Sequence, residues 1–322
     1  MRDWVIVILF SLIALLFCYV SIGQAAIAED KDFFTDQKSG LIFNDYLIRL
    51  DNIARIIVMN SSTSNIVVIG KDNWLFTDVN ESMADYRGLT HLSESQLAYT
   101  LEIVKSERDY LKVPLILVVA PNKESIYPEY MPEGIKKINN DTQLDQVLAY
   151  FKENSDIKII DLRPVLIKAK SERQVYRKND SHWNSYGAYI AYREIIGATG
   201  LTAHDLSDYK EVVSTNAYGN QTGDLSRALK LEDMYPESEV INWYELKDVP
   251  SDKLPSALIF HDSFYTSTNL QSLMASHFEK VMEVRYGQLT LFSSKLVEDA
   301  KPSVVIYIMV ERVLPRYFMP WR

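Results

Sequence analysis

The segment from Val113 to Ala120 reads VPLILVVA, an unbroken apolar run of about the length of one β-strand. The same pattern returns at 257–260 (ALIF) and at 304–309 (VVIYIM). A strand that is apolar at every position is buried on both faces, which is typical of the parallel sheets of α/β proteins. These runs therefore predict an α/β fold in which helices cover both faces of the sheet.

Helical patterns alternate with the apolar runs. Helices are expected at 142–153, 185–196 and 268–278, and shorter strands at 157–160 and 281–284. Such alternation predicts right-handed crossovers and hence a doubly wound, mostly parallel sheet. Ser93 and Gln96 have the spacing of a capping box, which predicts a helix that starts after Ser93. The 65–76 segment is typical of a β-hairpin, and 41–59 contains an amphipathic stretch.

The composition is that of a folded globular protein, with 47% apolar and 24% charged residues. The 322 residues include 34 basic and 43 acidic ones, so the net charge of −9 does not favour a nucleic-acid partner. One cysteine excludes an internal disulfide, a cysteine-based zinc site and an iron–sulfur cluster. We expect neither a metal nor another cofactor.

The N-terminus contains 20 consecutive uncharged residues, Trp4 to Gly23. This is the length that a helix needs to cross a membrane, and Arg2 supplies a positive flank. Residues 26–28 (AIA) fit a signal-peptidase site, so 1–28 is either a cleaved signal peptide or an uncleaved signal anchor. We favour the anchor because the run exceeds a usual signal core. The remainder, 29–322, is expected to form one exported domain, periplasmic or on the extracytoplasmic face of the cytoplasmic membrane.

A polar loop with the sequence DSHWN (180–184) precedes the helix expected at 185–196. A histidine that acts as a general base needs a carboxylate on Nδ1, which fixes its tautomer and stabilises the imidazolium. Asp180 and His182 supply both groups from one short loop. The alternative is structural, with Asp180 as a helix cap and His182 as a half-buried neighbour.

A second motif, HDSF (261–264), follows the apolar run at 257–260. Ser263 is thus expected at a strand-to-helix turn, where backbone N–H groups surround an exposed hydroxyl and can form an oxyanion hole. A serine hydroxyl needs an adjacent base, and His182 is the candidate. His261 is a rival base, and the structural alternative is that Asp262 or Ser263 only caps the turn.

Together these motifs resemble a known family, the SGNH-hydrolase-like proteins of alginate O-acetylation, of the AlgJ/AlgX type. The resemblance extends through most of the exported part. The matching pieces are GKDNWLF (70–76), APNK (120–123), YPE (127–129), Pro132, DSHWN (180–184), Gly187-Ala188, GDL (223–225), HDSF (261–264) and VER (310–312).

The resemblance implies an O-acetyltransferase with Ser263, His182 and Asp180 as catalytic residues. Ser263 would carry an acetyl group from a donor to a hydroxyl of an exported or cell-surface polysaccharide. It also implies an SGNH-hydrolase-like fold for 29–322 and a membrane-bound O-acyltransferase as the partner that brings the acetyl group across the membrane.

Four more residues are candidates for oxyanion or substrate contacts. The Ser263 N–H is one expected oxyanion donor. The second donor is left open among Asn122, Arg285 and Tyr307, which lie near predicted strand ends and each have an ordinary structural alternative. Trp183 is a candidate for stacking on a sugar ring, although tryptophan is more often a core residue.

Two other functions fit the same residues. One is a glycan acetylesterase, in which water replaces the sugar hydroxyl. The other is a non-catalytic scaffold that holds polysaccharide or assembly partners. A separation of Ser263 and His182 beyond hydrogen-bonding distance would favour the scaffold.

Overall fold

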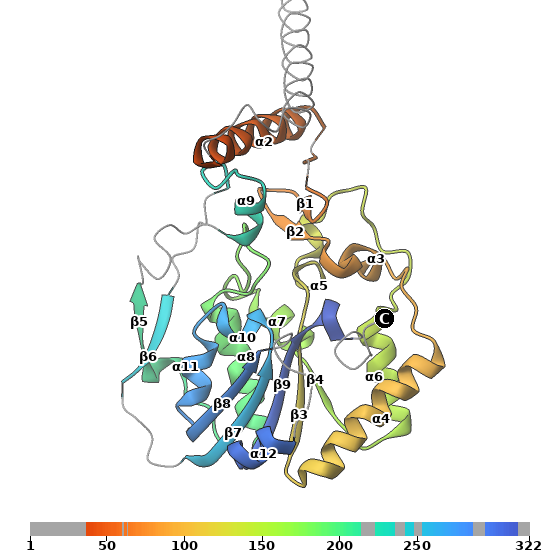
Figure 1. Cartoon of the computed structure of the whole chain (residues 1–322), viewed down its shortest axis with the longest axis vertical. Coiled ribbons are helices and arrows are strands. Elements are labelled where there is room, and N and C mark those ends of the chain that lie inside the picture. The colour runs from red at the N-terminus through yellow and green to blue at the C-terminus, as the bar shows by residue number, and fades with distance from the viewer. Residues whose placement is uncertain are drawn as a thin grey trace, which may run out of the picture.

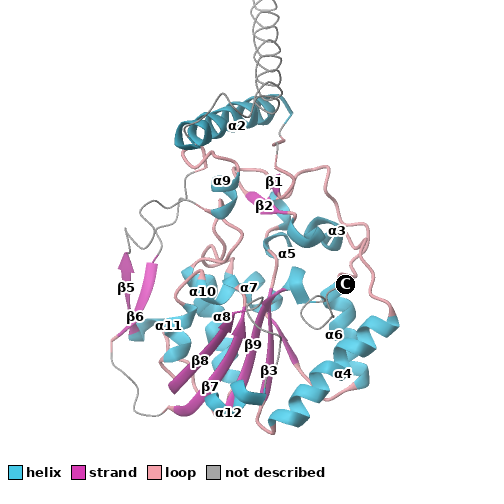
Figure 2. Ribbon diagram, in the orientation of Figure 1, coloured by secondary structure: helices cyan, strands magenta, loops and turns pink. Residues whose placement is uncertain are grey.

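The computed structural model describes residues 37–59, 61–62, 64–213, 223–235, 242–247, 253–285 and 294–314. Within them, a five-stranded parallel sheet has the order β4-β3-β9-β7-β8 (Figures 1 and 2). Its strands are β3 (Leu115–Ala120), β4 (Ile159–Asp161), β7 (Leu254–His261), β8 (Phe278–Arg285) and β9 (Val304–Val310). The predicted parallel α/β sheet is confirmed.

Successive strand residues face opposite sides of the sheet and divide the core into two layers. In β3, Ile116 and Val118 belong to one layer, whereas Leu117 and Val119 belong to the other. The first layer is completed by α7 (Arg163–Ala169), α8 (Ser185–Ala198) and α11 (Leu270–Ala275), and the second by α4 (Glu94–Leu111), α6 (Gln143–Asn154) and α12 (Ser294–Ala300). Helices therefore cover both faces, as the apolar strands require.

The other elements lie on the side of the molecule where the sheet strands end, with α2 farthest from the sheet (Figure 1). They are α2 (Gln37–Met59), α3 (Ser82–Tyr86), α5 (Lys123–Ile126), α9 (Asp224–Ala228), α10 (Ser263–Thr266) and the antiparallel hairpin β1 (Val67–Ile69)–β2 (Leu75–Thr77). A second antiparallel pair, β5 (Tyr209–Val213)–β6 (Asn242–Leu246), lies beside the sheet. Short 3₁₀ turns span Val79–Glu81, Pro128–Tyr130, Leu206–Asp208 and Glu311–Val313.

Helix starts follow local capping chemistry. Ser93 and Gln96 form the predicted capping box of α4. Asn184 caps α8, because its side chain accepts a hydrogen bond from the Gly187 N–H at 2.9 Å. This cap ends the 180–184 loop and fixes where the loop joins the helical layer.

The helix expected at 268–278 differs from the structure. Two short helices, α10 and α11, replace it, and Thr268 and Asn269 lie buried between them. Ser263 is therefore the first residue of a helix and not part of a longer loop. The predicted segment 1–28 lies outside the described residues, and among the helices that the structure describes none is long and apolar enough to span a membrane.

A buried carboxyl group lies in the second core layer. The Tyr307 hydroxyl of β9 donates a hydrogen bond to Glu107 of α4 at 2.8 Å. Burial raises the pKa of Glu107 from 4.5 to about 7, although the hydrogen bond opposes the shift. The folded state therefore holds this proton more tightly than the unfolded chain does.

Glu107→Gln tests this coupling, because glutamine keeps an acceptor for Tyr307 and does not ionise. A raised carboxyl pKa costs the native state stability as pH rises from 4.5 to about 7. From about pH 4 to pH 8, the wild-type unfolding free energy should fall by about 3 kcal/mol more than that of the variant. Urea titrations measure this difference.

Glu102→Gln, on the exposed face of the same helix, is the matched control and should follow the wild type. Parallel stability curves for wild type and Glu107→Gln would contradict the assignment.

Candidate active site

Ser263 stands at the C-terminal end of β7, where α10 begins. Asp262 fixes this turn, because one carboxylate oxygen accepts the Phe264 N–H at 2.8 Å and the other accepts the Val310 N–H at 2.6 Å. The second bond ties the turn to the end of β9. Both carboxylate oxygens of Asp262 are thus bound to backbone N–H groups, and the Ser263 hydroxyl is left to other partners.

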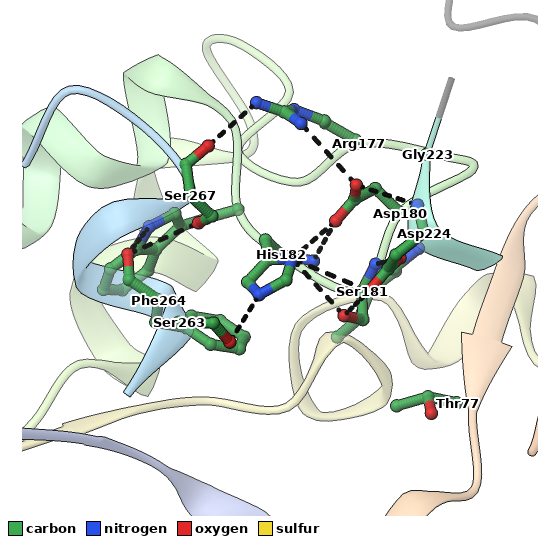
Figure 3. A network of polar contacts seen from close by, with 12 residues as sticks. Thr77, Arg177, Asp180, Ser181, His182, Gly223, Asp224, Ser263, Phe264 and Ser267 are labelled. Carbon is green, nitrogen blue, oxygen red and sulfur yellow. Dashed lines mark hydrogen bonds and ion pairs between the residues drawn. The ribbon is translucent and has the colours of Figure 1, made fainter. Parts of the chain in front are cut away.

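His182 lies beside Ser263, 81 residues away in sequence. Its Nε2 is 2.8 Å from Ser263 Oγ, and its Nδ1 is 2.7 Å from Asp180 Oδ1 (Figure 3). An ionised carboxylate only accepts, so Nδ1 carries the proton and Nε2 accepts from the serine hydroxyl. The structure therefore brings the three predicted residues together in a continuous hydrogen-bond chain.

Asp180 is the buried end of this chain, with 8% of its side chain exposed. Burial alone would raise its pKa, but hydrogen bonds from the His182 ring and backbone and the charge of Arg177, 3.6 Å away, outweigh it. The pKa of Asp180 is thus held well below its usual range. The carboxylate stays ionised at neutral pH and stabilises an imidazolium on His182.

Asp224, the first residue of α9, holds the loop from the other side. Its carboxylate accepts the Ser181 N–H at 2.7 Å and the Ser181 hydroxyl at 2.5 Å (Figure 3). Its own N–H donates to Asp180 Oδ2 at 3.1 Å. Gly223 permits this approach, since a Cβ there would meet the Asn179 carbonyl oxygen at 2.0 Å.

No role for Asp224 was predicted from the sequence, although GDL (223–225) is among the pieces that carry the resemblance. The residue lies 43 positions from Ser181, and a lone aspartate after a glycine has no local signature. Only the packing of α9 against the loop reveals its function.

Asp180, His182 and Asp224 also offer three possible metal-ligand atoms within 4.8 Å of one another. Each of these side chains already makes hydrogen bonds: His182 donates to Asp180, and Asp224 accepts from Ser181. We therefore interpret the cluster as a hydrogen-bonded relay.

Lys123 joins the loop to the small hairpin. Its ammonium is buried and donates to the carbonyl oxygens of Leu75 and Lys178, at 2.5 and 3.1 Å. The Leu75 N–H donates to the same Lys178 carbonyl at 2.9 Å. Two of the pieces that carry the resemblance, 70–76 and 120–123, thus meet at one buried cation, together with Lys178, which lies two residues before the 180–184 piece.

Asn122 follows β3, and both its backbone N–H and its side-chain oxygen are hydrogen-bonded. Its N–H donates to Glu311 Oε2 at 2.9 Å, and its Oδ1 accepts from Arg312 Nη1 at 3.1 Å. The Arg312 guanidinium lies 5.6 Å from the centre of the Phe264 ring. Asn122 is thereby connected to the helix that Ser263 begins.

The other candidates lie elsewhere. The prediction that Trp183 stacks on sugar is wrong, because its ring is fully buried and its Nε1 donates to the Phe264 carbonyl at 3.0 Å. Tyr307 points into the second core layer toward Glu107. Within the described residues, Arg285 is exposed at the end of β8 without a hydrogen bond or ion pair to the relay.

His261, the rival base, does not pair with Ser263. It is buried, with Nδ1 2.9 Å from the Asp262 carbonyl oxygen, and its ring packs on Tyr265. Strand alternation alone would place residues 261 and 263 on the same face, so it is the contacts of the His261 ring that separate it from the Ser263 hydroxyl.

The chain is similar to several known proteins. A family model described as "SGNH hydrolase-like domain, acetyltransferase AlgX" matches residues 67–262. The match contains Asp180 and His182 and ends immediately before Ser263. A probable alginate O-acetylase AlgJ from Pseudomonas putida is 25% identical over 282 residues, covering 77% of this chain and 70% of the relative. Its namesake from Pseudomonas aeruginosa is 30% identical over 176 residues, covering 53% and 43%.

Solved structures share the fold. The O-acetyltransferase domain of Pseudomonas putida AlgJ has a TM-score of 0.56 at 23% identity, covering 77% of this chain and 92% of that one. Bacillus cereus PatB1 with a sulfonyl adduct has a TM-score of 0.54 at 15% identity, covering 77% and 97%. These similarities confirm the SGNH-like α/β fold.

The geometry predicts that Ser263 reacts with phenylmethylsulfonyl fluoride, because His182 accepts the proton of its hydroxyl. His182→Ala should slow this labelling by about 10²-fold or more, the usual effect of a positioned base. Intact-mass measurements over time follow the reaction, and peptide mapping locates the adduct.

Ser267→Ala, three residues beyond Phe264 on the same helical segment, is the control and should label at the wild-type rate. Labelling that persists in Ser263→Ala at the wild-type rate would exclude Ser263 as the activated serine.

Proposed function

The chain belongs to the SGNH hydrolase-like acetyltransferase family of AlgX and is an acyltransferase; from this premise, we propose that it acetylates hydroxyls of an exported or cell-surface polysaccharide through Ser263. The observation that carries the mechanism is the hydrogen-bond chain from Asp180 through His182 to Ser263 Oγ, with links of 2.7 and 2.8 Å. Matched relatives named alginate O-acetylase support a polysaccharide acceptor.

In the first half-reaction, His182 Nε2 takes the proton of Ser263 as Oγ attacks the carbonyl carbon of an acetyl ester. The tetrahedral intermediate collapses, His182 gives the proton to the departing alcohol, and Ser263 holds the acetyl group as an ester. Asp180 stabilises the transient imidazolium. The low pKa of Asp180 supports this role, because the carboxylate remains charged while His182 is protonated.

In the second half-reaction, a sugar hydroxyl replaces the departed alcohol. His182 takes the hydroxyl proton, the sugar oxygen attacks the acetyl carbonyl, and Ser263 leaves with the proton returned by His182. The same relay with water as acceptor would be an acetylesterase. A non-catalytic scaffold has no need of a serine activated by a base, and the 2.8 Å contact therefore favours catalysis.

Two donors are assigned to the oxyanion of the intermediates. The first is the Ser263 N–H, for which the described residues hold no acceptor, whereas the neighbouring Phe264 N–H is already bound by Asp262. The second is the Asn122 amide nitrogen, because Arg312 occupies the amide oxygen. Donors of this kind are each worth about 10²–10³ in rate.

Place and partners complete the proposal. The uncharged run from Trp4 to Gly23 supports export and tethering at the membrane, with 29–322 on the outer side. The acetyl donor would then be supplied by a membrane-bound O-acyltransferase, which the resemblance implies. Residues 1–28 belong to this proposal and not to the described structure.

The test uses the full chain, purified in detergent micelles, with p-nitrophenyl acetate as donor and oligosaccharides as acceptors. The wild type should release nitrophenol and acetylate the oligosaccharide. Turnover should fall by about 10⁴-fold or more in Ser263→Ala and in His182→Ala, and by less in Asp180→Asn, as in other serine relays. Mass spectrometry of the oligosaccharide measures transfer directly.

The Ser267→Ala variant should retain wild-type turnover. If added oligosaccharide does not reduce the transfer of acetyl groups to water, the protein is an acetylesterase. Wild-type turnover in Ser263→Ala would refute the serine mechanism.

A further inference from the structure

We propose that Arg312 is a positioning residue: together with Glu311 it holds Asn122 so that the amide presents N–H, and not C=O, to the reacting acetyl group. The inference deepens the proposed function and depends on it, because it explains how the second oxyanion donor is oriented. We call Glu311 and Arg312 the Asn122 clamp.

The two consecutive residues of the clamp bind different groups of Asn122, its backbone N–H and its side-chain oxygen. Glu311 Oε2 accepts the Asn122 N–H at 2.9 Å and the Ser125 hydroxyl at 2.8 Å. Arg312 Nη1 donates to Asn122 Oδ1 at 3.1 Å. The backbone and the side chain of Asn122 are thus fixed by the same turn, Glu311–Val313, that follows β9.

The sheet explains why this turn has that role. β9 lies between β3 and β7, with Val310 paired to Ala120 on one side and bound to Asp262 on the other. The residues just after Val310 therefore lie between the end of β3, which carries Asn122, and the end of β7, which carries Ser263. No other strand end separates the two.

Arginine sets the orientation of the amide by chemistry alone. A guanidinium only donates hydrogen bonds, so its partner on Asn122 has to be the oxygen. The amide nitrogen then takes the opposite side of the planar group, and no hydrogen bond among the described residues engages it. A flipped amide would direct an oxygen at a developing negative charge, which is repulsive.

Arg312 is itself held without an ion pair. Its guanidinium lies over the Phe264 ring at 5.6 Å, and within the described residues no carboxylate lies within 4.0 Å of it. The charge of Arg312 also reaches buried Glu124, where it opposes the rise of the carboxyl pKa to about 7 that burial causes, but no ion pair joins these two described side chains. With no carboxylate attached, the guanidinium stays free to hold the neutral amide.

A double-mutant cycle tests whether Arg312 acts through Asn122. Steady-state hydrolysis of p-nitrophenyl acetate by the full chain is compared for wild type, Asn122→Ala, Arg312→Met and the double variant. We expect kcat to fall about 10²-fold in Asn122→Ala and about 10-fold in Arg312→Met, with little change in KM. In the Asn122→Ala background, Arg312→Met should not lower kcat any further.

Two conservative variants sharpen the cycle. Arg312→Lys keeps a donor for Oδ1 and should recover most of the loss. Asn122→Asp keeps the contact to Arg312 but has no side-chain N–H, and its kcat should fall as far as that of Asn122→Ala. The pH–rate profile should keep its shape in Arg312→Met, because His182 is not involved. Arg193→Met, on the exposed surface of α8, is the matched control and should behave as wild type.

Losses that multiply in the double variant, or a shifted pH profile in Arg312→Met, would overturn the inference, since Arg312 would then act on substrate or through Phe264 and His182. An unaffected kcat in Arg312→Met would overturn it as well. Arg312→Leu, which also lacks a donor, is run in parallel with thermal unfolding of every variant, in case Arg312→Met fails to fold, and its kcat should fall to the same extent. An inactive wild type would instead defeat the proposed function.

Discussion

Asp180 keeps an ionised carboxylate almost out of contact with water, and the rest of the site depends on how that charge is stabilised. Burial of a charge is costly, so the carboxylate has to be surrounded by donors. The His182 ring and backbone, the Asp224 N–H and the nearby Arg177 guanidinium supply them. These contacts fix the imidazole tautomer, and the tautomer in turn decides that Nε2 faces Ser263 as an acceptor.

A loop that carries such a charge needs support from outside itself. Asn184 ends the loop at the start of α8, Asp224 of α9 binds Ser181, and Lys123 donates a hydrogen bond to the Lys178 carbonyl oxygen. On the other side, Asp262 ties the Ser263 turn to β9. The relay is therefore assembled from two loops that are each fixed to a different rigid neighbour, which is how a catalytic geometry is kept without substrate.

The strands that make the sheet were predictable because their side chains are apolar at every position, as in VPLILVVA (113–120). The relay residues were predictable because DSHWN and HDSF carry paired functional groups at expected element ends. Trp183 and Tyr307 were misplaced for the opposite reason: which face of a helix or strand a side chain takes depends on packing that a local pattern does not contain. Asp224 and the Asn122 clamp were missed because their partners are 43 and 190 residues away.

The most direct measurement is a rapid-quench experiment in which the full chain is mixed with an activated acetyl ester and stopped within a few turnovers. Intact mass and peptide mapping then locate any covalent acetyl group. An acetyl ester on Ser263 that forms and decays at rates consistent with turnover is the result predicted here. Turnover without a covalent acetyl group, or with the acetyl group on another residue, would contradict the account.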